Sequence, residues 1–316
     1  MVKSVAIACQ GGGSHTAFTA GVLKRILREE NGDYEIGGLS GTSGGAICAL
    51  LAWYGLLNND KNKSIRLLDS FWRDIAANSF LDILLNDWII WVSKFQGIIP
   101  MVNISPYDYP PWAQEHMRSI LNKLVDFDDI GMLINESSPD LLVGAADVLS
   151  GKFKVFENSE INADAILASA AVPTFLRAIH IDGKVYWDGL FSQNPPVKNF
   201  IESAKIHEKP DEIWIIHINP QQRHYEPVSI KEIDDRRNEL SGNISLYQEL
   251  DFIENVNKWI GAGYLPGDRY KHIEIKWIGK LKENRDYESK LDRKPQFIQD
   301  MMNHGEQQAE EFLRQL

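Results

Sequence analysis

Apolar and polar positions follow a regular order in the first 57 residues of the chain. An apolar stretch at residues 2–9 leads into a glycine-rich turn, and apolar residues then occur at helical spacing from Phe18 to Leu27. A second apolar stretch at residues 34–39 leads through a sharp turn into an apolar segment at residues 44–57. Two successive strand, turn and helix units predict a parallel sheet with helices on both faces.

The rest of the chain continues this alternation. Further strands are predicted at residues 141–146, 152–156, 184–187, 213–218 and 272–278. Apolar residues from Gln296 onward, spaced along one helix face, predict a closing amphipathic helix. The sequence contains no internal repeat, low-complexity tract or linker. We therefore expect one domain over residues 1–316, with a three-layer α/β fold, a mostly parallel central sheet, and a motif-bearing core over about residues 3–200.

One inserted segment interrupts the alternation. Residues 80–95 are too rich in apolar side chains to leave a broad solvated helix face, so something must cover them. An aromatic, proline-containing loop follows at residues 107–112. Two interpretations stay open: packing into the core, or an apolar groove or lipid-docking surface with Trp88, Trp91 and Phe95 as lipid contacts.

Composition narrows the class of protein. The 316 residues include 33 Lys and Arg against 44 Asp and Glu, a net charge of −11. This balance argues against general nucleic-acid binding, which needs an excess of cations to displace counterions. The two cysteines, Cys9 and Cys48, cannot form a disulfide framework, and their apolar surroundings predict inert packing. No zinc ligand spacing or calcium loop occurs, so no metal or other cofactor is expected.

The sequence also bears on location. The longest run without a strongly polar side chain, residues 44–57, has 14 residues. A membrane span needs about 18 or more, so we expect no transmembrane segment. The first residues lack the pattern of a secretory signal. We therefore expect a cytoplasmic protein, with any membrane contact peripheral; export without a signal and the oligomeric state are left open.

The turn after the second strand carries the first candidate chemistry. Gly41-Thr42-Ser43-Gly44-Gly45 matches G-x-S-x-G in the strand, turn and helix context that a nucleophile elbow requires. The glycines permit a tight turn because a side chain would collide across it, and Ser43 would project its hydroxyl above the sheet. The following helix directs its first N–H groups toward the same place. The pattern predicts a catalytic serine, with a purely structural elbow as the alternative.

A second glycine cluster, Gly11-Gly12-Gly13, lies between the first strand and the first helix. Both turns fall at the carboxyl ends of neighbouring parallel strands, where ligands bind in open α/β sheets. Backbone N–H groups there suit a developing oxyanion. No Lys follows the glycines, and Thr16 stands where a dinucleotide fingerprint needs Gly, so neither nucleotide motif is complete. A tight turn and a phosphate cradle remain the alternatives.

A serine hydroxyl needs a base to accept its proton. Asp188 follows an apolar strand and precedes Gly189 and Leu190, and burial there would raise its pKa from about 3.9 and strengthen it as a base. Taken alone, Asp-Gly is a common turn signal. An α/β-hydrolase triad using His217 or His272 is a competing interpretation, and a phosphate- or nucleotide-binding module is a non-enzymatic one.

The motifs gain specificity from their order along the chain. Together they resemble the patatin-like phospholipase family over roughly residues 3–200, through Gly11-Gly12-Gly13, Gly41-Thr42-Ser43-Gly44-Gly45, Ala168-Ser169-Ala170-Ala171-Val172-Pro173, Asp188-Gly189 and the following Asn194-Pro195-Pro196. The resemblance implies a lipid acyl hydrolase of phospholipase A or lysophospholipase type, acting on lipid or a membrane surface. It implies Ser43 as nucleophile, Asp188 as base without a catalytic histidine, and the amides of residues 11–13 as the oxyanion hole.

This sequence departs from the family pattern at four positions. The family's glycine loop commonly has Asp before it and a basic residue then Gly after it, whereas this chain has Gln10, His15 and Thr16 there. The change removes a basic side chain that would add charge support for the oxyanion, while the backbone donors remain. His15 fits a helix cap or a packed side chain better than a substitute cation. Leu190 stands where Gly or Ala is frequent, a change that we expect to be tolerated.

Overall fold

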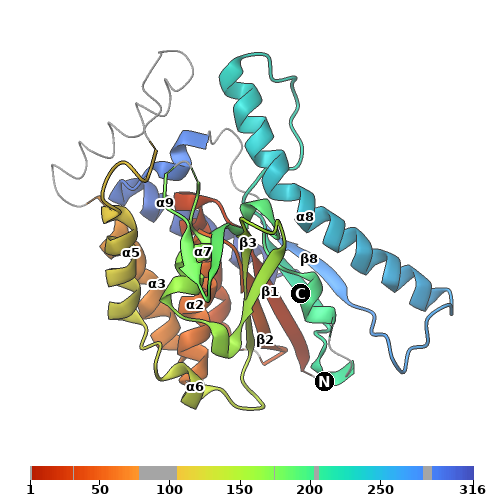
Figure 1. Ribbon diagram of the computed structural model, residues 1–316. Helices are drawn as coiled ribbons and strands as arrows, with labels where there is room; N and C mark the ends of the chain where they lie inside the picture. The colour runs from red at the N-terminus through yellow and green to blue at the C-terminus, as the bar shows by residue number, and fades with distance from the viewer. Residues whose placement is uncertain (1, 31, 78–104, 174, 203–205, 280–286) are drawn as a thin grey trace.

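The computed structural model describes residues 2–30, 32–77, 105–173, 175–202, 206–279 and 287–316. A central sheet has strand order β5-β6-β3-β2-β1-β7-β8, with β4 also paired to β3 (Figure 1). Five neighbouring strands pair in parallel: β1 (Lys3–Cys9), β2 (Tyr34–Gly41), β3 (Asp140–Asp147), β7 (Glu212–Ile216) and β8 (Glu274–Ile278). Antiparallel pairing adds β4 (Phe153–Glu157), β5 (Ile179–Ile181) and β6 (Lys184–Asp188).

Helices cover both faces of the sheet, which confirms the predicted three-layer α/β class. One face packs against α1 (Ala17–Leu27), α2 (Gly44–Leu57), α3 (Lys61–Ile75), α5 (Trp112–Leu124), α7 (Ala163–Ser169) and α9 (Pro295–Leu313), with the short α6 (Ile130–Leu133) at the rim of this core. The other face packs against the long helix α8 (Ile230–Gly261), which lies on the opposite side of the sheet (Figure 1). Alternate residues of β1 enter the two cores, so this strand is apolar on both faces.

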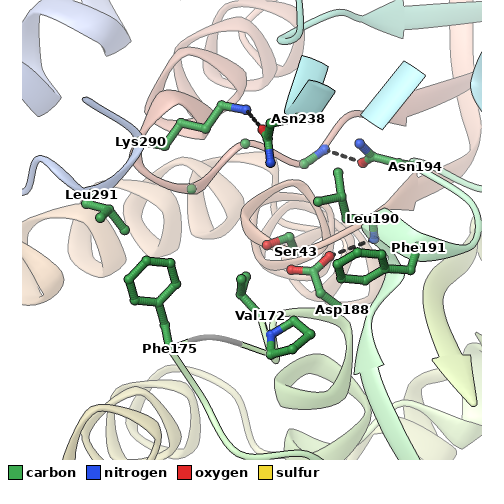
Figure 2. A pocket seen from close by; sticks show the side chains of 14 residues that line it. Ser43, Val172, Phe175, Asp188, Leu190, Phe191, Asn194, Asn238, Lys290 and Leu291 are labelled. Carbon is green, nitrogen blue, oxygen red and sulfur yellow. Dashed lines mark hydrogen bonds between the residues drawn. The ribbon is translucent and has the colours of Figure 1, made fainter. Parts of the chain in front are cut away.

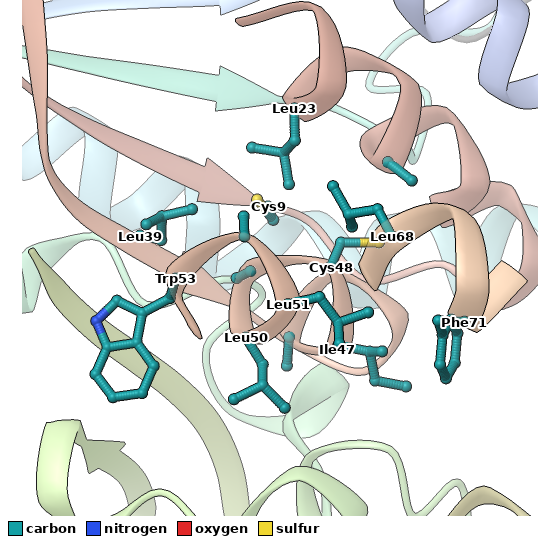
Figure 3. Packing of buried hydrophobic residues seen from close by; sticks show 14 of the residues in the cluster. Cys9, Leu23, Leu39, Ile47, Cys48, Leu50, Leu51, Trp53, Leu68 and Phe71 are labelled. Atoms are coloured by element: carbon teal, nitrogen blue, oxygen red, sulfur yellow. The ribbon is translucent and has the colours of Figure 1, made fainter. Parts of the chain in front are cut away.

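Helix α2 is the buried core helix that the apolar run predicted. It is surrounded by residues of β1, β2, α1 and α3, including Leu23, Leu39 and Leu68 (Figure 3). Both cysteines are free and buried in this core. Burial raises the pKa of Cys9 well above its usual value and that of Cys48 to about 12, so both remain protonated packing residues, as predicted. Among the described helices, none is both long enough and apolar enough to cross a membrane.

The C-terminal elements join the same sheet and core as the motif-bearing region. Strand β8 pairs with β7, and the predicted closing helix, α9, packs on α1 at a close crossing. The crossing is close because each helix has a glycine at the contact. A Cβ at Gly21 would lie 2.0 Å from the Met302 carbonyl oxygen, and a Cβ at Gly305 would lie 2.1 Å from the Phe18 carbonyl oxygen. That residues 1–316 form one domain stays a prediction.

Each predicted strand overlaps an observed one, whereas several elements were not predicted. Strand β5 has only three residues, too few for a periodic pattern. Helix α8 was missed because charged residues interrupt its apolar positions over 32 residues. The loop predicted at residues 107–112 is wrong at its end, since Trp112 begins helix α5. The inserted segment at residues 80–95, with Trp88, Trp91 and Phe95, lies outside the described residues.

Candidate active site

The turn between β2 and α2 places Ser43 in a strained backbone conformation. Its φ of 56° and ψ of −129° lie where residues other than glycine are rare, and it is the N-cap of α2. The three flanking glycines have no room for a side chain. A Cβ at Gly41 would lie 2.5 Å from the Ala46 Cα. Cβ atoms at Gly44 and Gly45 would each lie 2.2 Å from an oxygen, the Thr16 Oγ1 and the Cys9 carbonyl oxygen respectively. The residues therefore form the sharp elbow that the motif predicted.

Ser169, at the end of α7, forms a hydrogen bond with the backbone of this elbow. The Ser43 N–H donates to the Ser169 Oγ at 3.0 Å, and the Ser169 hydroxyl donates to the Gly144 carbonyl oxygen of β3 at 2.6 Å. Ser169 is fully buried, so its hydrogen bond to Gly144 is shielded from water and the one from Ser43 is partly shielded. The sequence indicated Ser169 only as part of the residue 168–173 motif and gave it no role, because its partner is 126 positions away in the chain.

Asp188 ends β6 and begins a short 3₁₀ turn, Gly189–Phe191. Its Oδ1 accepts the Leu190 N–H at 2.7 Å, and its own N–H donates to the Ala171 carbonyl oxygen at 3.0 Å. The residue is 1% exposed. The turn packs closely on β3 at Gly189, where a Cβ would lie 2.4 Å from the Gly144 carbonyl oxygen. Leu190 contacts the carboxylate through its backbone N–H, a hydrogen bond that does not depend on the side chain. That Leu190 is tolerated here stays a prediction.

The structure brings the side chains of Ser43 and Asp188 together in one pocket (Figure 2). Burial raises the pKa of Asp188 to about 7. Three smaller influences oppose this rise: the Leu190 N–H, the hydrogen-bonding interaction with the Ser43 side chain, and the positive charge of Lys290. A carboxylate with this pKa is half-protonated near neutral pH, so it can both accept and return a proton there.

The glycine loop lies against the elbow and lines the same pocket. The Gly11 N–H is already used, since it donates to the Asn194 Oδ1 at 2.8 Å. Within the described part of the chain, the N–H groups of Gly12 and Gly13 have no hydrogen-bond partner. Gly13 has a φ of +56°, a conformation that glycine adopts without strain. Of the three predicted donors, two are thus left available to a ligand.

The residues that depart from the family pattern have structural roles around this loop. Gln10 is fully buried, and its Oε1 accepts the N–H groups of Ile218 and Asn219, both at 2.8 Å. His15 is 2% exposed, and its Nε2 lies 2.7 Å from the Ser289 Oγ. His15 is therefore the packed side chain that the sequence favoured.

The pocket holds about 820 Å³ of empty space, part of it open to solvent. Apolar side chains form much of its wall: Val172, Pro173, Phe175, Leu190, Phe191 and Leu291. Asn194, Asn238 and Lys290 supply polar groups (Figure 2). Asn238 and Lys290 were not predicted, because no motif accompanies them and they follow the glycine loop by more than 200 positions.

Neither candidate triad histidine lines the pocket. The His217 ring packs against Tyr247 and Trp277, at centroid distances of 6.1 and 5.2 Å. His272 is exposed and precedes β8, so it lies at the opposite edge of the parallel sheet from Ser43, which follows β2. The described residues also contain no cluster of three or more His, Cys, Asp or Glu side chains that could hold a metal ion.

A strained serine turn, a glycine loop and a buried carboxylate meet at the carboxyl edge of the parallel sheet, where α/β proteins bind ligands. The chain belongs to the patatin-like phospholipase family, whose family model matches residues 7–201. The match includes Gly11 to Gly13, the elbow and Asp188. None of the curated proteins compared with the chain matches it.

Solved structures of two bacterial proteins are similar to this one. The crystal structure of VipD from Legionella pneumophila has 12% identity and a TM-score of 0.43, covering 99% of this chain and 67% of that chain. The type III effector protein ExoU has 13% identity and a TM-score of 0.38, covering 98% and 53%. The ExoU–SpcU heterodimer from Pseudomonas aeruginosa has 13% identity and a TM-score of 0.40, covering 99% and 51%. The chain thus spans about half the length of ExoU.

The support of the elbow by Ser169 leads to a stability prediction. Ser169→Ala removes the acceptor of the partly buried Ser43 N–H and the donor to the Gly144 carbonyl oxygen, and we expect the free energy of unfolding to fall by about 1–3 kcal/mol. Urea unfolding measures this change. Ser70→Ala on α3 is the matched control, because the Ser70 hydroxyl only accepts an exposed hydrogen bond from Arg73, and its effect should stay within about 0.5 kcal/mol. Equal stability of the two variants would contradict a supporting role for Ser169.

Proposed function

We propose that this protein is a serine lipid acyl hydrolase of the phospholipase A or lysophospholipase type, with Ser43 as nucleophile and Asp188 as base. The observation that carries the proposal is the meeting of the strained Ser43 elbow and the buried Asp188 carboxylate in one pocket (Figure 2). Membership of the patatin-like phospholipase family supports a lipid ester as the substrate.

In the first step, Asp188 accepts the Ser43 hydroxyl proton as the serine oxygen attacks the carbonyl carbon of the ester. The carbonyl oxygen becomes an oxyanion, and the N–H groups of Gly12 and Gly13 are the donors proposed to stabilise it. When the tetrahedral intermediate collapses, the bond to the alcohol breaks. The alcohol leaves with the proton from Asp188, and the acyl group remains on Ser43.

In the second step, water repeats the sequence on the acyl-enzyme. Asp188 accepts a proton from the water as its oxygen attacks the acyl carbon, and the same donors stabilise the second oxyanion. Collapse releases the carboxylic acid and returns the proton to Ser43. One carboxylate with a pKa of about 7 suits both proton transfers near neutral pH, so this scheme needs no imidazole.

The apolar wall of the pocket supports a fatty acyl chain as the occupant. Phe175 and Phe191 extend the wall outward, and Phe191 is 55% exposed. The net charge of −11 makes attraction to anionic lipid head groups weak, so apolar contact would drive binding. The lipid contact predicted for Trp88, Trp91 and Phe95 stays a prediction from the sequence, as do the position of the ester that is cut and the location of the protein.

The first test removes each member of the dyad. Ser43→Ala and Asp188→Asn should each lower kcat on a soluble ester by roughly 10³-fold or more, because attack on the carbonyl needs both the hydroxyl and its base. A fluorophosphonate probe should label the wild-type serine and not the Ser43→Ala variant. His217→Ala and His272→Ala are the controls and should keep near-wild-type rates. Loss of turnover in either histidine variant would favour a triad, and nucleotide binding without labelling would favour a binding module.

The raised pKa of Asp188 links activity to stability. The base must be ionised, so kcat should rise with pH through about 7. Since the folded-state pKa exceeds the unfolded value of about 3.9, the neutral acid stabilises the fold below that value, and stability falls as pH rises toward 7. Asp188→Asn removes the ionisable group and therefore the loss of stability that its ionisation causes. Urea unfolding should therefore show the inactive variant to be more stable than wild type at pH 8 and equally stable near pH 4. A variant less stable than wild type at pH 8 would contradict a raised pKa of Asp188 in the folded protein.

The substrate class is tested at the pocket rim. Phe191→Ser should raise KM for a decanoyl ester by roughly tenfold, because apolar contact with the chain is lost, and should leave KM for an acetyl ester unchanged. Phe153→Ser on β4 is the matched control, since Phe153 is 61% exposed and does not line the pocket. Equal effects on both esters would argue against an acyl site here. Parallel assays on phospholipid, lysophospholipid and triacylglycerol, with Ser43→Ala as the blank, identify the lipid class.

A further inference from the structure

Lys290 reaches the glycine loop from the far end of the chain. It lies on the 3₁₀ turn η6 (Tyr287–Leu291) and lines the pocket together with Gly11 to Gly13, Ser43 and Asp188. Its Nζ donates to the Oδ1 atoms of Asn219 and Asn238, both at 2.8 Å (Figure 2 shows the contact with Asn238). The dyad mechanism described above assigns no role to this cation.

The backbone of η6 is fixed against the glycine loop. A Cβ at Gly13 would lie 2.4 Å from the Lys290 carbonyl oxygen, so only glycine permits this approach. The neighbouring residue, Ser289, contacts the His15 Nε2 through its Oγ at 2.7 Å. These contacts join the loop and η6, which are more than 270 residues apart in the sequence. They fix the backbone position from which the Lys290 side chain extends.

A short chain of hydrogen bonds connects Lys290 to the proposed oxyanion donors. Lysine only donates, so its contact requires the amide oxygen of Asn219 to face it, and the Asn219 Nδ2 then faces the Gly11 carbonyl oxygen at 3.3 Å. Asn219 is 1% exposed, and its N–H is held by Gln10. The Gly11 carbonyl belongs to the same peptide unit as the Gly12 N–H. A donor on that oxygen polarises the unit and makes the N–H a stronger donor.

We propose that Lys290 is a positioning residue that acts through Asn219 to orient and polarise the Gly11–Gly12 peptide, so that the Gly12 N–H holds the oxyanion more strongly. This inference rests on the proposed ester hydrolysis at Ser43. Lys290 does not touch the reacting atoms in this scheme. Its positive charge also acts at longer range, since it lowers the pKa of Asp188.

The surroundings of Lys290 give this role a pH signature. Desolvation lowers the pKa of Lys290 to about 8, against the opposing influence of three carboxylates: Glu239 and Asp235 of α8, and Asp188. The amides of Asn219 and Asn238 are uncharged. The ammonium form should therefore be lost as pH rises through about 8. Activity would need Asp188 ionised and Lys290 protonated, which gives a narrow bell-shaped profile of kcat between the two values.

The test compares Lys290→Met with Lys290→Arg on a soluble ester. The Met variant keeps the length of the side chain and loses the charge and its hydrogen bonds; its kcat should fall roughly 10- to 100-fold, less than for loss of a direct donor, with KM changed less than twofold. Its profile should lack the fall above pH 8, and its rise should move to higher pH because the pKa of Asp188 is no longer lowered. The Arg variant should recover much of kcat and keep it above pH 8, because arginine stays protonated.

A second variant tests the relay itself. Asn219→Asp keeps an acceptor for Lys290 and removes the N–H donor to the Gly11 carbonyl oxygen, so kcat should fall at least as far as in Lys290→Met. Affinity for a trifluoromethyl ketone, which forms an oxyanion on Ser43, should fall in both variants in parallel with kcat/KM. A normal kcat in Asn219→Asp would overturn the relay even if Lys290→Met is slow.

The controls separate this inference from the proposed function. Lys24→Met removes another lysine with little exposure, which pairs with Asp69 and Glu306. None of these three residues lines the pocket, so the change should leave kcat unchanged. Absence of ester hydrolysis in the wild-type protein above the Ser43→Ala blank would refute the proposed function. Hydrolysis that is equally fast, with the same pH profile, in wild type and Lys290→Met would refute the role of Lys290 alone. Thermal unfolding of each variant shows whether lost activity reflects lost folding.

Discussion

The strained, positive-φ backbone at Ser43 is the constraint on which the site depends. A residue with a side chain adopts this conformation only when its surroundings hold it there. Three glycines let β1, the glycine loop and α2 approach the turn, and the Ser169 hydroxyl accepts the Ser43 N–H. Since Ser169 also donates to Gly144 of β3, the elbow is fixed to the strand next to its own. Close packing of the sheet and helices thus determines where the serine hydroxyl points.

The Asp188 environment shows a conflict between stability and reactivity. Removing a carboxylate from water destabilises its charged form, and few groups in the described region compensate for this at the Asp188 oxygens. A fully paired carboxylate would stabilise the fold and would be a weak base. The partial compensation by the Leu190 N–H and the Ser43 side chain leaves a group that titrates near neutral pH. Perturbed carboxylates of this kind are found mainly at functional sites, where the fold tolerates their cost.

Buried side-chain hydrogen bonds link the glycine-loop region to α8, the helix on the other face of the sheet. The Asn194 and Asn219 side chains hydrogen-bond to Gly11 of the loop. The Gln10 side chain accepts the Asn219 N–H and donates to α8, and Asn194 also donates to α8. These polar groups are buried, and each needs its partner because an unpaired buried amide is costly. The loop that supplies the proposed donors is therefore positioned mainly by segments from the second half of the chain.

The sequence by itself determined the strands of the sheet other than β5, the core helix α2, the elbow at Ser43 and the aspartate that ends β6. These features follow from periodicity and from turn residues that are adjacent in the chain, so local chemistry specifies them. It did not reveal α8, the support of Ser43 by Ser169, the use of the Gly11 N–H by Asn194, or the position of Lys290. Only the tertiary structure decided these contacts, because a hydrogen bond between residues far apart in the chain depends on how the whole sheet and its helices pack. No local pattern records that packing.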